Sequence, residues 1–506
     1  MQKALAVLIA CVALMAIGAS LLKLHDASAG LNIEATEIGS IPAHIYRSEK
    51  RSSAPVVVIA HGFAGSQQLM QSFAMAIARN GYIAVTFDFA GHGRNPSALM
   101  GSITEETGAT QTLMAETAKV VAFARGLGDG RVAVLGHSMA SDIVVRVAQA
   151  DPTIAATIAV SMFSPVVTDT SPRNLLVIVG GWEGMLKTEA LRAVGLASAP
   201  KEAEVGVVYG DPSQGTGRMV VFSPNTEHVS VLFSLDSLKA AVQWLDKSFG
   251  VQRTVPLQLD ARGPWIALLI AGAVVLARQF AKLLPRVSHG KGGAGLGWKR
   301  LWLPLFLPAL VTPLLLRVLP THFLPVLVAD YLAVHFAMYG LLTIACLLWM
   351  KQHGGGTVPR VSMPFILASF CVIAYQAVVL FWPLDHYFTN FVPGLNRLPI
   401  LLAMVIGTLL YFMSDEWLTR GEKAVRASYA VNKIMFLVSL GIATALDFER
   451  LFFLVIIIPL ILLFFLIFGL FSMWIYNRTR DPLVAGLTNA LSFAWAIGVT
   501  FPILAG

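Results

Sequence analysis

The sequence predicts two kinds of structure in one chain: an α/β domain with a mostly parallel sheet, followed by an all-helical domain that crosses a membrane several times. From about residue 31 to residue 250, short apolar runs typical of strands alternate with helical patterns. This alternation is typical of a parallel sheet covered by helices on both faces. From Pro264 onward, long apolar runs follow one another, and such runs are long enough to cross a bilayer.

The composition agrees with a large membrane part. Of the 506 residues, 56% are hydrophobic and 13% are charged, whereas about 25% charged residues are usual in a soluble domain. The cysteines, Cys11, Cys346 and Cys371, all lie in apolar runs, so we expect no disulfide framework and no cysteine-rich zinc site. The net charge of +8 does not indicate nucleic-acid binding, because the basic residues are concentrated in loops between the apolar runs.

Residues 1–25 are predicted to form an N-terminal transmembrane anchor. The apolar run 4–22 lies between Lys3 and Lys23 and can span about 30 Å of hydrocarbon. A cleaved secretory signal ending at Ala27-Ser28-Ala29 is the alternative. The lipobox-like Leu8-Ile9-Ala10-Cys11 is a weaker alternative, because the apolar run continues past the cysteine. Each interpretation predicts that the following domain is exported.

The domain over residues 26–250 is predicted to alternate strands with helices, as a doubly wound sheet requires. Strands are expected at 32–36, 43–47, 55–60, 83–87, 131–135, 157–161, 175–179, 205–209 and 218–222, and helices at 67–79, 106–126, 141–150, 186–193 and 234–249.

A linker over residues 251–263 leads to a polytopic transmembrane domain over residues 264–506, with about eight helices. Together with the first apolar run, this makes about nine spans. The apolar runs are 265–281, 301–319, 325–350, 361–383, 398–413, 429–446, 451–476 and 483–504.

The basic residues of the connecting loops predict the orientation of the spans. With the N-terminus inside, the predicted cytoplasmic loops carry most of the Lys and Arg residues, as the positive-inside rule requires. We therefore expect an integral membrane protein, of a bacterial inner membrane, with the α/β domain and the C-terminus on the extracytoplasmic side. The predicted cytoplasmic residues are Lys282, Arg286, Lys291, Lys299, Arg300, Lys351, Arg360, Arg420, Lys423, Arg426, Arg478 and Arg480, and the predicted outer ones are Arg317, Arg397 and Arg450.

A strand pattern that ends in Gly136-His-Ser-Met-Ala140 provides the candidate nucleophile, Ser138. An amphipathic helical pattern starts directly after the serine. A nucleophile elbow places its serine on a tight, strained turn between a strand and a helix. Such a turn requires small residues two positions before and after the serine, and Gly136 and Ala140 meet this requirement.

The candidate general base and its acidic partner come later in the chain, in the order serine, acid, histidine. His228 lies between the last predicted strand and the last predicted helix, in a loop that can reach the sheet edge where Ser138 projects. Glu183 follows the predicted strand 175–179 and is the candidate that holds the imidazole tautomer. Asp211 is the alternative acid, but it follows the next predicted strand.

Two backbone N–H groups are the candidates for an oxyanion hole. The Met139 N–H follows the nucleophile directly. The Phe63 N–H lies in the loop His61-Gly-Phe-Ala-Gly-Ser66, where Gly62 allows a close approach of the backbone. A well-aimed donor of this kind contributes about 3 kcal/mol to transition-state stabilisation.

Together these motifs resemble the α/β-hydrolase superfamily over roughly residues 31–250. The resemblance implies a doubly wound, mostly parallel sheet, and it implies that Asp88 is a structural aspartate that orders the loop near the oxyanion hole. The sequence departs from the family pattern at Ala140 and Glu183, where glycine and aspartate are more usual. The motifs that carry the resemblance are His61-Gly-Phe, Asp88-Phe-Ala-Gly-His-Gly93, Gly136-His-Ser-Met-Ala140 and the later Glu183 and His228.

The superfamily often inserts a cap domain after the sixth strand, but here only residues 162–173 separate the two predicted strands at this point. This segment is too short for a helical cap. We therefore expect an open site, or one that the membrane domain covers.

Polar residues inside the spans are expected to hold the helices together, although such residues also mark transport paths. A second polar group is predicted at the outer face, and it could instead dock the hydrolase domain or a lipid headgroup. The residues inside the spans are Asp330, His335, Gln376, Asn432, Lys433 and Asn489, and those at the outer face are His322, Asp385, His386, Asp447, Glu449 and Arg450.

The sequence as a whole predicts a membrane-anchored serine hydrolase of carboxylesterase or lipase type, with Ser138 as nucleophile, His228 as base and Glu183 as its partner. The Phe63 and Met139 amides would hold the oxyanion. We expect a small-molecule or lipid ester and membrane lipids as partners, and no nucleic acid, metal or cofactor. An acyltransferase would use the same residues, and a transporter or membrane-assembly protein with a non-catalytic exported domain is the alternative from another class.

Overall fold

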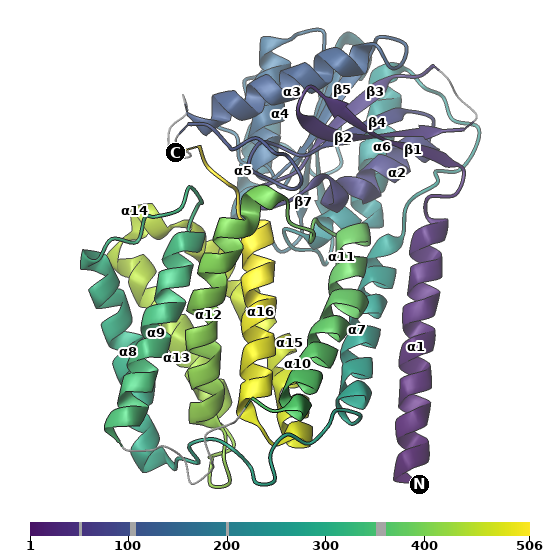
Figure 1. The fold of residues 1–506 in the computed structure, drawn as a ribbon. Coiled ribbons are helices and arrows are strands. Elements are labelled where there is room, and N and C mark those ends of the chain that lie inside the picture. The colour runs from purple at the N-terminus through teal and green to yellow at the C-terminus, as the bar shows by residue number, and fades with distance from the viewer. Residues whose placement is uncertain (50–52, 102–107, 199–201, 351–360, 506) are drawn as a thin grey trace. The chain divides into compact units, whose positions relative to one another are not determined.

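The computed structural model describes residues 1–49, 53–101, 108–198, 202–350 and 361–505, which form two compact units. Figure 1 shows the strands gathered in one of them and long helices in the other. The sheet unit comprises Gly18–Leu269 and two short later segments, Leu384–Asn390 and Pro502–Gly506. The helical unit comprises Met1–Ile17, Ile270–Pro383 and Phe391–Phe501.

The sheet has eight strands in the order β1-β2-β4-β3-β5-β6-β7-β8. Strand β2 pairs antiparallel with both β1 and β4, and all other neighbours are parallel. The predicted fold class, a doubly wound and mostly parallel sheet, is therefore confirmed. The strands are β1 (Leu31–Ile38), β2 (Ile41–Ser48), β3 (Val56–Ala60), β4 (Ile83–Phe87), β5 (Val132–His137), β6 (Ala156–Val160), β7 (Leu175–Gly180) and β8 (Arg218–Ser223).

Helices cover both faces of this sheet, and its central strands are accordingly buried at every position. In β3, Val57 and Ile59 pack with residues of α2 and α6, while Val56 and Val58 pack on the other face with residues of α3 and α4. This alternation follows from the two-residue repeat of a strand. The helices of the sheet unit are η1 (Gln67–Met70), α2 (Gln71–Arg79), α3 (Ala109–Arg125), α4 (Met139–Ala150), α5 (Gly184–Gly195), η2 (Pro212–Gln214), η3 (Ser230–Phe233) and α6 (Leu235–Phe249).

One predicted strand, 205–209, is wrong. Gly206 and Gly210 both have positive φ angles, of 80° and 71°, so the backbone turns where an extended strand was expected. Only Tyr209 forms a bridge, to Arg218. Val205 and Val207, which suggested the strand, are exposed instead. The predicted start of the helix 106–126 lies outside the described residues.

Nine helices in the described parts of the chain are long and apolar enough to cross a membrane, which agrees with the predicted number of spans. The fifth of them is continuous through α10, the π-helical turn η4 and α11 (Met363–Tyr387). The elements are α1 (Gln2–Asp26), α7 (Arg262–Ala281), α8 (Trp298–Val318), α9 (Ala329–Trp349), α10 (Met363–Tyr375), η4 (Gln376–Phe381), α11 (Trp382–Tyr387), α12 (Leu398–Thr419), α13 (Ser428–Leu446), α15 (Phe453–Thr479) and α16 (Pro482–Thr500), with the shorter η5 (Leu395–Arg397) and α14 (Phe448–Leu451).

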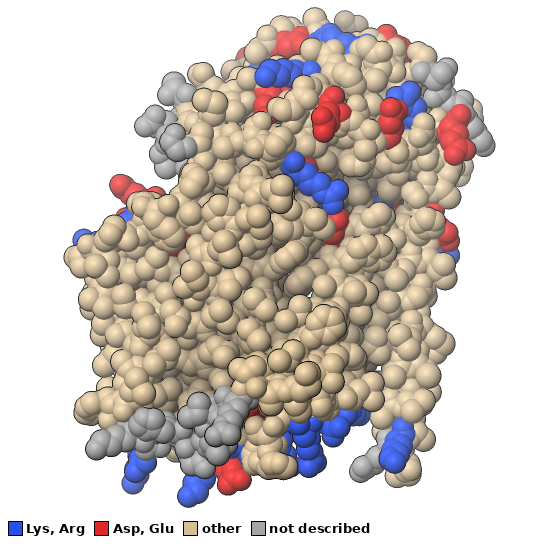
Figure 2. All heavy atoms as spheres, in the orientation of Figure 1, with Lys and Arg blue, Asp and Glu red and all other residues tan. Residues whose placement is uncertain are grey.

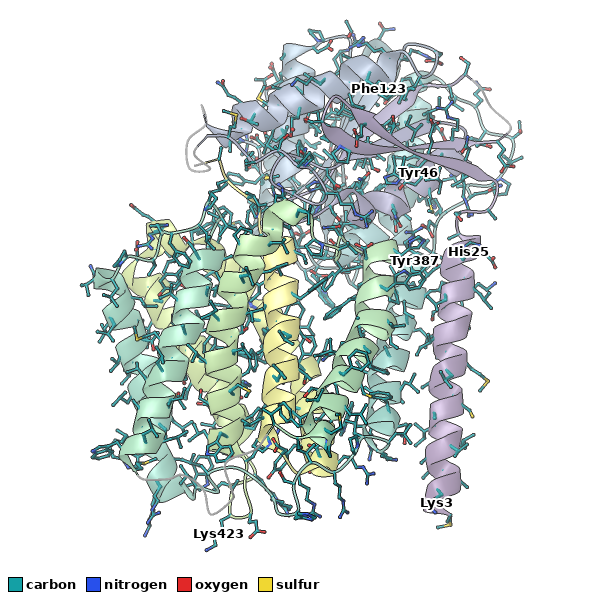
Figure 3. The ribbon with its side chains drawn as sticks, in the orientation of Figure 1. Lys3, His25, Tyr46, Phe123, Tyr387 and Lys423 are labelled. Carbon is teal, nitrogen blue, oxygen red and sulfur yellow. The ribbon has the colours of Figure 1, made fainter. Side chains whose placement is uncertain are left out.

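Basic side chains gather at one end of the helical unit, and an uncharged band covers the length of its helices (Figure 2). The labelled Lys3 and Lys423 lie at this same end (Figure 3), as expected if both lie on one side of a membrane. Two residues of the predicted cytoplasmic set, Lys351 and Arg360, lie outside the described residues.

The polar residues inside the helical unit bind one another. The Lys433 ammonium lies 2.6 Å from the Asp415 carboxylate, and Asn432 donates to the same carboxylate at 2.7 Å. Four aromatic rings surround the ammonium with their centroids 4.5–4.9 Å away. Such paired groups join α12 to α13, which is the packing role expected for polar residues in spans.

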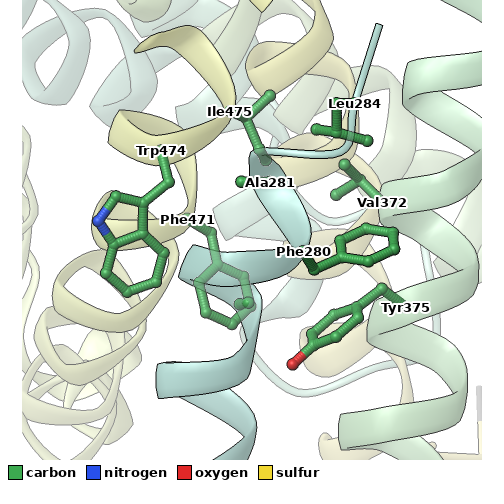
Figure 4. A pocket seen from close by; sticks show the side chains of 9 residues that line it. Phe280, Ala281, Leu284, Val372, Tyr375, Phe471, Trp474 and Ile475 are labelled. Atoms are coloured by element: carbon green, nitrogen blue, oxygen red, sulfur yellow. The ribbon is translucent and has the colours of Figure 1, made fainter. Parts of the chain in front are cut away.

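A small apolar pocket in the helical unit lies between α7, α10 and α15 (Figure 4). The rings of Phe280 and Tyr375 stack on one side of it, with centroids 4.8 Å apart. Tyr375 donates its hydroxyl to the Ala273 carbonyl at 2.5 Å. The pocket offers no nucleophile, so the chemistry suggested by the sequence has to be sought in the sheet unit.

Candidate active site

Ser138 stands on a strained turn between β5 and α4. Its backbone has φ 54° and ψ −120°, a conformation that a residue with a side chain adopts only where the surroundings enforce it. A Cβ atom on Gly136 would lie 2.2 Å from the Ala140 carbonyl oxygen, so only glycine fits there. Ala140 is fully buried, and its methyl group is accommodated. The turn therefore has the geometry of a nucleophile elbow.

His228 reaches the serine from the loop between β8 and η3. Its Nε2 atom lies 2.8 Å from Ser138 Oγ, and its Nδ1 atom lies 2.5 Å from Glu183 Oε1. Because a carboxylate accepts hydrogen bonds, Nδ1 carries the proton, and Nε2 is then free to accept the serine proton. The imidazole is 41% exposed, so a substrate can approach it.

Glu183 follows β7 and precedes α5. Its second carboxylate oxygen accepts hydrogen bonds from Ser161 Oγ and from the Gly180 N–H, each at 2.7 Å. Burial by itself would raise the pKa of Glu183, but the hydrogen bonds from His228, Ser161 and Gly180 outweigh it and lower the pKa below its usual value. The carboxylate is therefore held charged and fixed against the imidazole.

The alternative acid, Asp211, does not approach His228 in the described structure. It caps η2 and accepts hydrogen bonds from the backbone N–H and the hydroxyl of Ser213, at 2.8 and 2.7 Å. The exposed turn that replaces the predicted strand 205–209 explains this position. Of the two candidate acids, the structure brings Glu183 to the imidazole.

The loop after β3 comes into contact with the nucleophile. A Cβ atom on Gly62 would lie 2.9 Å from Ser138 Cβ, so a side chain at this position would push the loop away. Phe63, whose N–H is one candidate oxyanion donor, follows directly and is half-buried. Met139 is the first residue of α4, so its N–H makes no hydrogen bond within that helix.

Hydrogen bonds of the buried His61 ring hold this loop in place. The Phe89 N–H donates to His61 Nε2 at 3.1 Å, so His61 Nδ1 carries the proton and donates to the Gly62 carbonyl at 2.8 Å. Burial lowers the pKa of His61, although the nearby Asp88 opposes the effect. The neutral His61 ring therefore holds the Gly62 carbonyl in a fixed position.

Asp88 connects two loops, which agrees with its expected structural role. Its carboxylate accepts hydrogen bonds from the Gln67 N–H at 2.8 Å and the Arg94 N–H at 3.0 Å. A Cβ atom on Gly93 would lie 2.3–2.6 Å from that carboxylate, so the glycine is required. Asp88 thus ties the end of the loop 61–66 to the loop that follows β4.

His137 is a site residue that the sequence analysis missed. It precedes the nucleophile, is buried, and its Nε2 donates to the His228 carbonyl at 2.8 Å. Burial, and then the proximity of His228, lower the pKa of His137 to about 3, so it stays neutral near neutral pH. The motif Gly136-His-Ser does not predict this contact, because the loop of His228 comes from much later in the chain.

The arrangement can perform nucleophilic acyl chemistry without a bound group. A hydroxyl, an imidazole and a carboxylate lie in series, as nucleophilic catalysis by a serine requires. Among the described residues, no cluster of His, Cys, Asp and Glu side chains could hold a metal ion. No helix separates β6 from β7, so this connection forms no cap over the site.

The chain is similar to one described protein family and to several solved structures. Residues 51–194 match a family model described as serine aminopeptidase, S33. None of the curated proteins matches the chain. A dienelactone hydrolase from Anabaena variabilis is 15% identical, with a TM-score of 0.32 over 44% of this chain and 98% of its own. A predicted hydrolase from Thermoplasma acidophilum is 14% identical, with the same score and coverage.

A hypothetical protein from Pseudomonas aeruginosa is 12% identical, with a TM-score of 0.33 over 44% of this chain and 95% of its own. At these identities and scores, the likenesses to solved structures carry no argument. The strand order and the family model matched over residues 51–194 show that the N-terminal part of this chain has an α/β-hydrolase-like fold.

Proposed function

We propose that this protein is a membrane-anchored serine hydrolase that cleaves hydrophobic or lipid-like acyl esters. The observation that carries the proposal is the series Ser138 Oγ, His228 and Glu183, with atom separations of 2.8 and 2.5 Å. The Ser138 proton passes to Nε2 of His228 as the oxygen attacks the acyl carbonyl, and Glu183 stabilises the resulting imidazolium. The Phe63 and Met139 amides hold the oxyanion.

The remaining steps of the reaction use the same groups. His228 returns the proton to the leaving alcohol, which leaves an acyl-enzyme on Ser138. Water, deprotonated by His228, then attacks the acyl carbonyl and releases the acid. An alcohol or amine in place of water would make the same site an acyltransferase, so the acceptor distinguishes the two activities.

Apolar side chains next to the site residues support a hydrophobic substrate. Trp182 and Met185, on either side of Glu183, are 69% and 79% exposed, and Val229, beside His228, is 36% exposed. Phe163, two residues after the serine that binds Glu183, is 60% exposed. Exposed apolar groups near a site favour the binding of apolar partners. An acyl chain or a membrane lipid fits this description.

The location of the activity is part of the proposal. Nine helices in the described residues can span a membrane, and the loop charges favour an inside N-terminus. The sheet unit would then act on the extracytoplasmic side, on substrates in or near the lipid. A cysteine-labelling experiment with an impermeant reagent on exposed sheet-unit positions tests this side.

Labelling with a fluorophosphonate probe tests the nucleophile. The purified full chain should be labelled, and Ser138→Ala should abolish labelling and ester hydrolysis. Ser237→Ala is the matched control, because its buried hydroxyl has no partner among the described residues. Undiminished labelling of Ser138→Ala would refute the assignment. Esters of graded chain length, together with aminoacyl anilides suggested by the aminopeptidase family model, then define the substrate class.

A further inference from the structure

A short late segment of the chain, Leu384–Asn390, belongs to the sheet unit although it follows α11. Its Phe388 packs against the core that α2 and α6 share. The Phe388 ring also stacks on Phe233 of η3, with centroids 5.8 Å apart and planes 19° apart. Because η3 directly follows the loop of His228, this segment contacts the element next to the loop that carries the proposed base.

The same segment binds the end of the loop 61–66. The Asn390 N–H donates to Ser66 Oγ at 2.9 Å, and the Thr389 hydroxyl lies 3.2 Å from the same Oγ. Ser66 is 1% exposed and Asn390 is 4% exposed. In such a buried position water cannot easily replace a lost partner, so these bonds fix the place of Ser66.

The Asn390 side chain holds the neighbouring loop as well. Its amide nitrogen donates to the Gly93 carbonyl at 3.3 Å, and its oxygen accepts from Arg94 Nε at 3.2 Å. Arg94 also forms an ion pair with Asp385 at 2.6 Å. Asp385 belongs to the predicted outer-face group.

These contacts are adjacent to those of Asp88, which holds Gln67 and Arg94 through their backbone N–H groups. Ser66 precedes Gln67 in the chain, so the late segment and Asp88 hold the loop at consecutive residues. Two residues before Ser66, Ala64 has a φ of 55°. A residue in this conformation persists only when the surrounding contacts over-determine it.

We infer that Thr389 and Asn390 are positioning residues for the oxyanion hole. By fixing Ser66 and the Gly93 carbonyl, they set the distance between the Phe63 N–H and the oxygen that develops charge at Ser138. The inference rests on the proposed function. It also means that the sheet unit is completed by residues that lie beyond most of the helices in the sequence.

Replacing Thr389 by valine tests the inference in the full chain. Thr389→Val keeps the shape of the side chain and removes the hydroxyl at Ser66. We expect kcat to fall about 10-fold, since a misplaced donor costs part of the roughly 100-fold effect of losing it, while KM changes less than about twofold. Thr389→Ser restores the hydroxyl and should restore kcat. Thr157→Val is the control, because this buried hydroxyl has no partner among the described residues.

Active protein is counted by fluorophosphonate titration, so that a loss of folded material does not lower kcat. If Thr389→Val keeps full kcat per labelled site, or if Thr389→Ser does not restore the loss, the inference is overturned. If the unaltered protein is not labelled at Ser138, the proposed function fails first. Equal melting temperatures of Thr389→Val and the unaltered protein, with reduced kcat, would support the positioning role.

Discussion

Gly62 offers the sharpest test of the proposed oxyanion loop, because its contacts can be converted into a displacement. An added Cβ would lie 2.9 Å from Ser138 Cβ and 3.1 Å from both Nδ1 and the carbonyl oxygen of His137. Carbon atoms in ordinary contact are about 3.5–4.0 Å apart. The loop in Gly62→Ala must therefore retreat from Ser138 by roughly 0.6–1 Å.

A retreat of this size takes the Phe63 N–H out of hydrogen-bond range of the oxyanion. Removing one such donor lowers kcat by about 100- to 1,000-fold, equivalent to about 3–4 kcal/mol of transition-state stabilisation. KM should change little, because the ground-state carbonyl makes weaker use of the donor. The assay compares kcat and KM for an ester of the best chain length, per fluorophosphonate-titrated site.

A control glycine separates this effect from a general loss of stability. In Gly195→Ala the new Cβ would meet nothing closer than Ser198 Oγ, at 4.0 Å, and α5 should tolerate it. If Gly62→Ala keeps kcat within about twofold of the unaltered protein, the loop is not the oxyanion hole. The roles given to Phe63 and to Gly62 would then both be withdrawn.

Two further predictions concern buried charge. The pKa of His137 is lowered to about 3 in the folded protein, against an ordinary value of 6.5. On acidification the unfolded chain therefore binds this proton first, and the free energy of unfolding falls by at most about 5 kcal/mol at pH 3. Between about pH 6.5 and pH 4, the melting temperature of His137→Gln should therefore fall less than that of the unaltered protein. An equal fall would contradict the lowered pKa of His137. Lys433→Met should destabilise the helical unit in detergent by about 3–5 kcal/mol, because it leaves Asp415 buried and unpaired. Adding Asp415→Asn should recover most of this loss, and a lone Lys433→Met that melts normally would show that the pair is dispensable.

Much of the fold could be predicted because its signals are local. The central strands are mostly apolar, and each transmembrane candidate is a long and predominantly apolar run, so periodicity and length suffice. The strand at 205–209 failed because two valines resemble a strand only when the glycines beside them are ignored. Gly206 and Gly210 take positive φ angles, and the segment turns.

The residues proposed for the site could be chosen from the sequence for a similar reason. Ser138, Glu183 and His228 follow strands in a known order, and parallel strands bring their carboxyl ends to one edge. The contacts of His137 and Asn390 could not be found in this way. Each depends on a partner about 90 residues or more away along the chain, and no sequence pattern marks such a pair.

The last strand-like residues of the chain also complete the sheet unit. The Ile503 N–H donates to the Gly91 carbonyl at 3.0 Å, and the Leu99 N–H donates to the Ile503 carbonyl at 2.8 Å. Leu504 packs against the buried core on this side of the sheet. These residues are therefore synthesised after the nine described helices that are long and apolar enough to cross a membrane. The sheet unit cannot form all of its contacts until that stretch of the chain has left the ribosome.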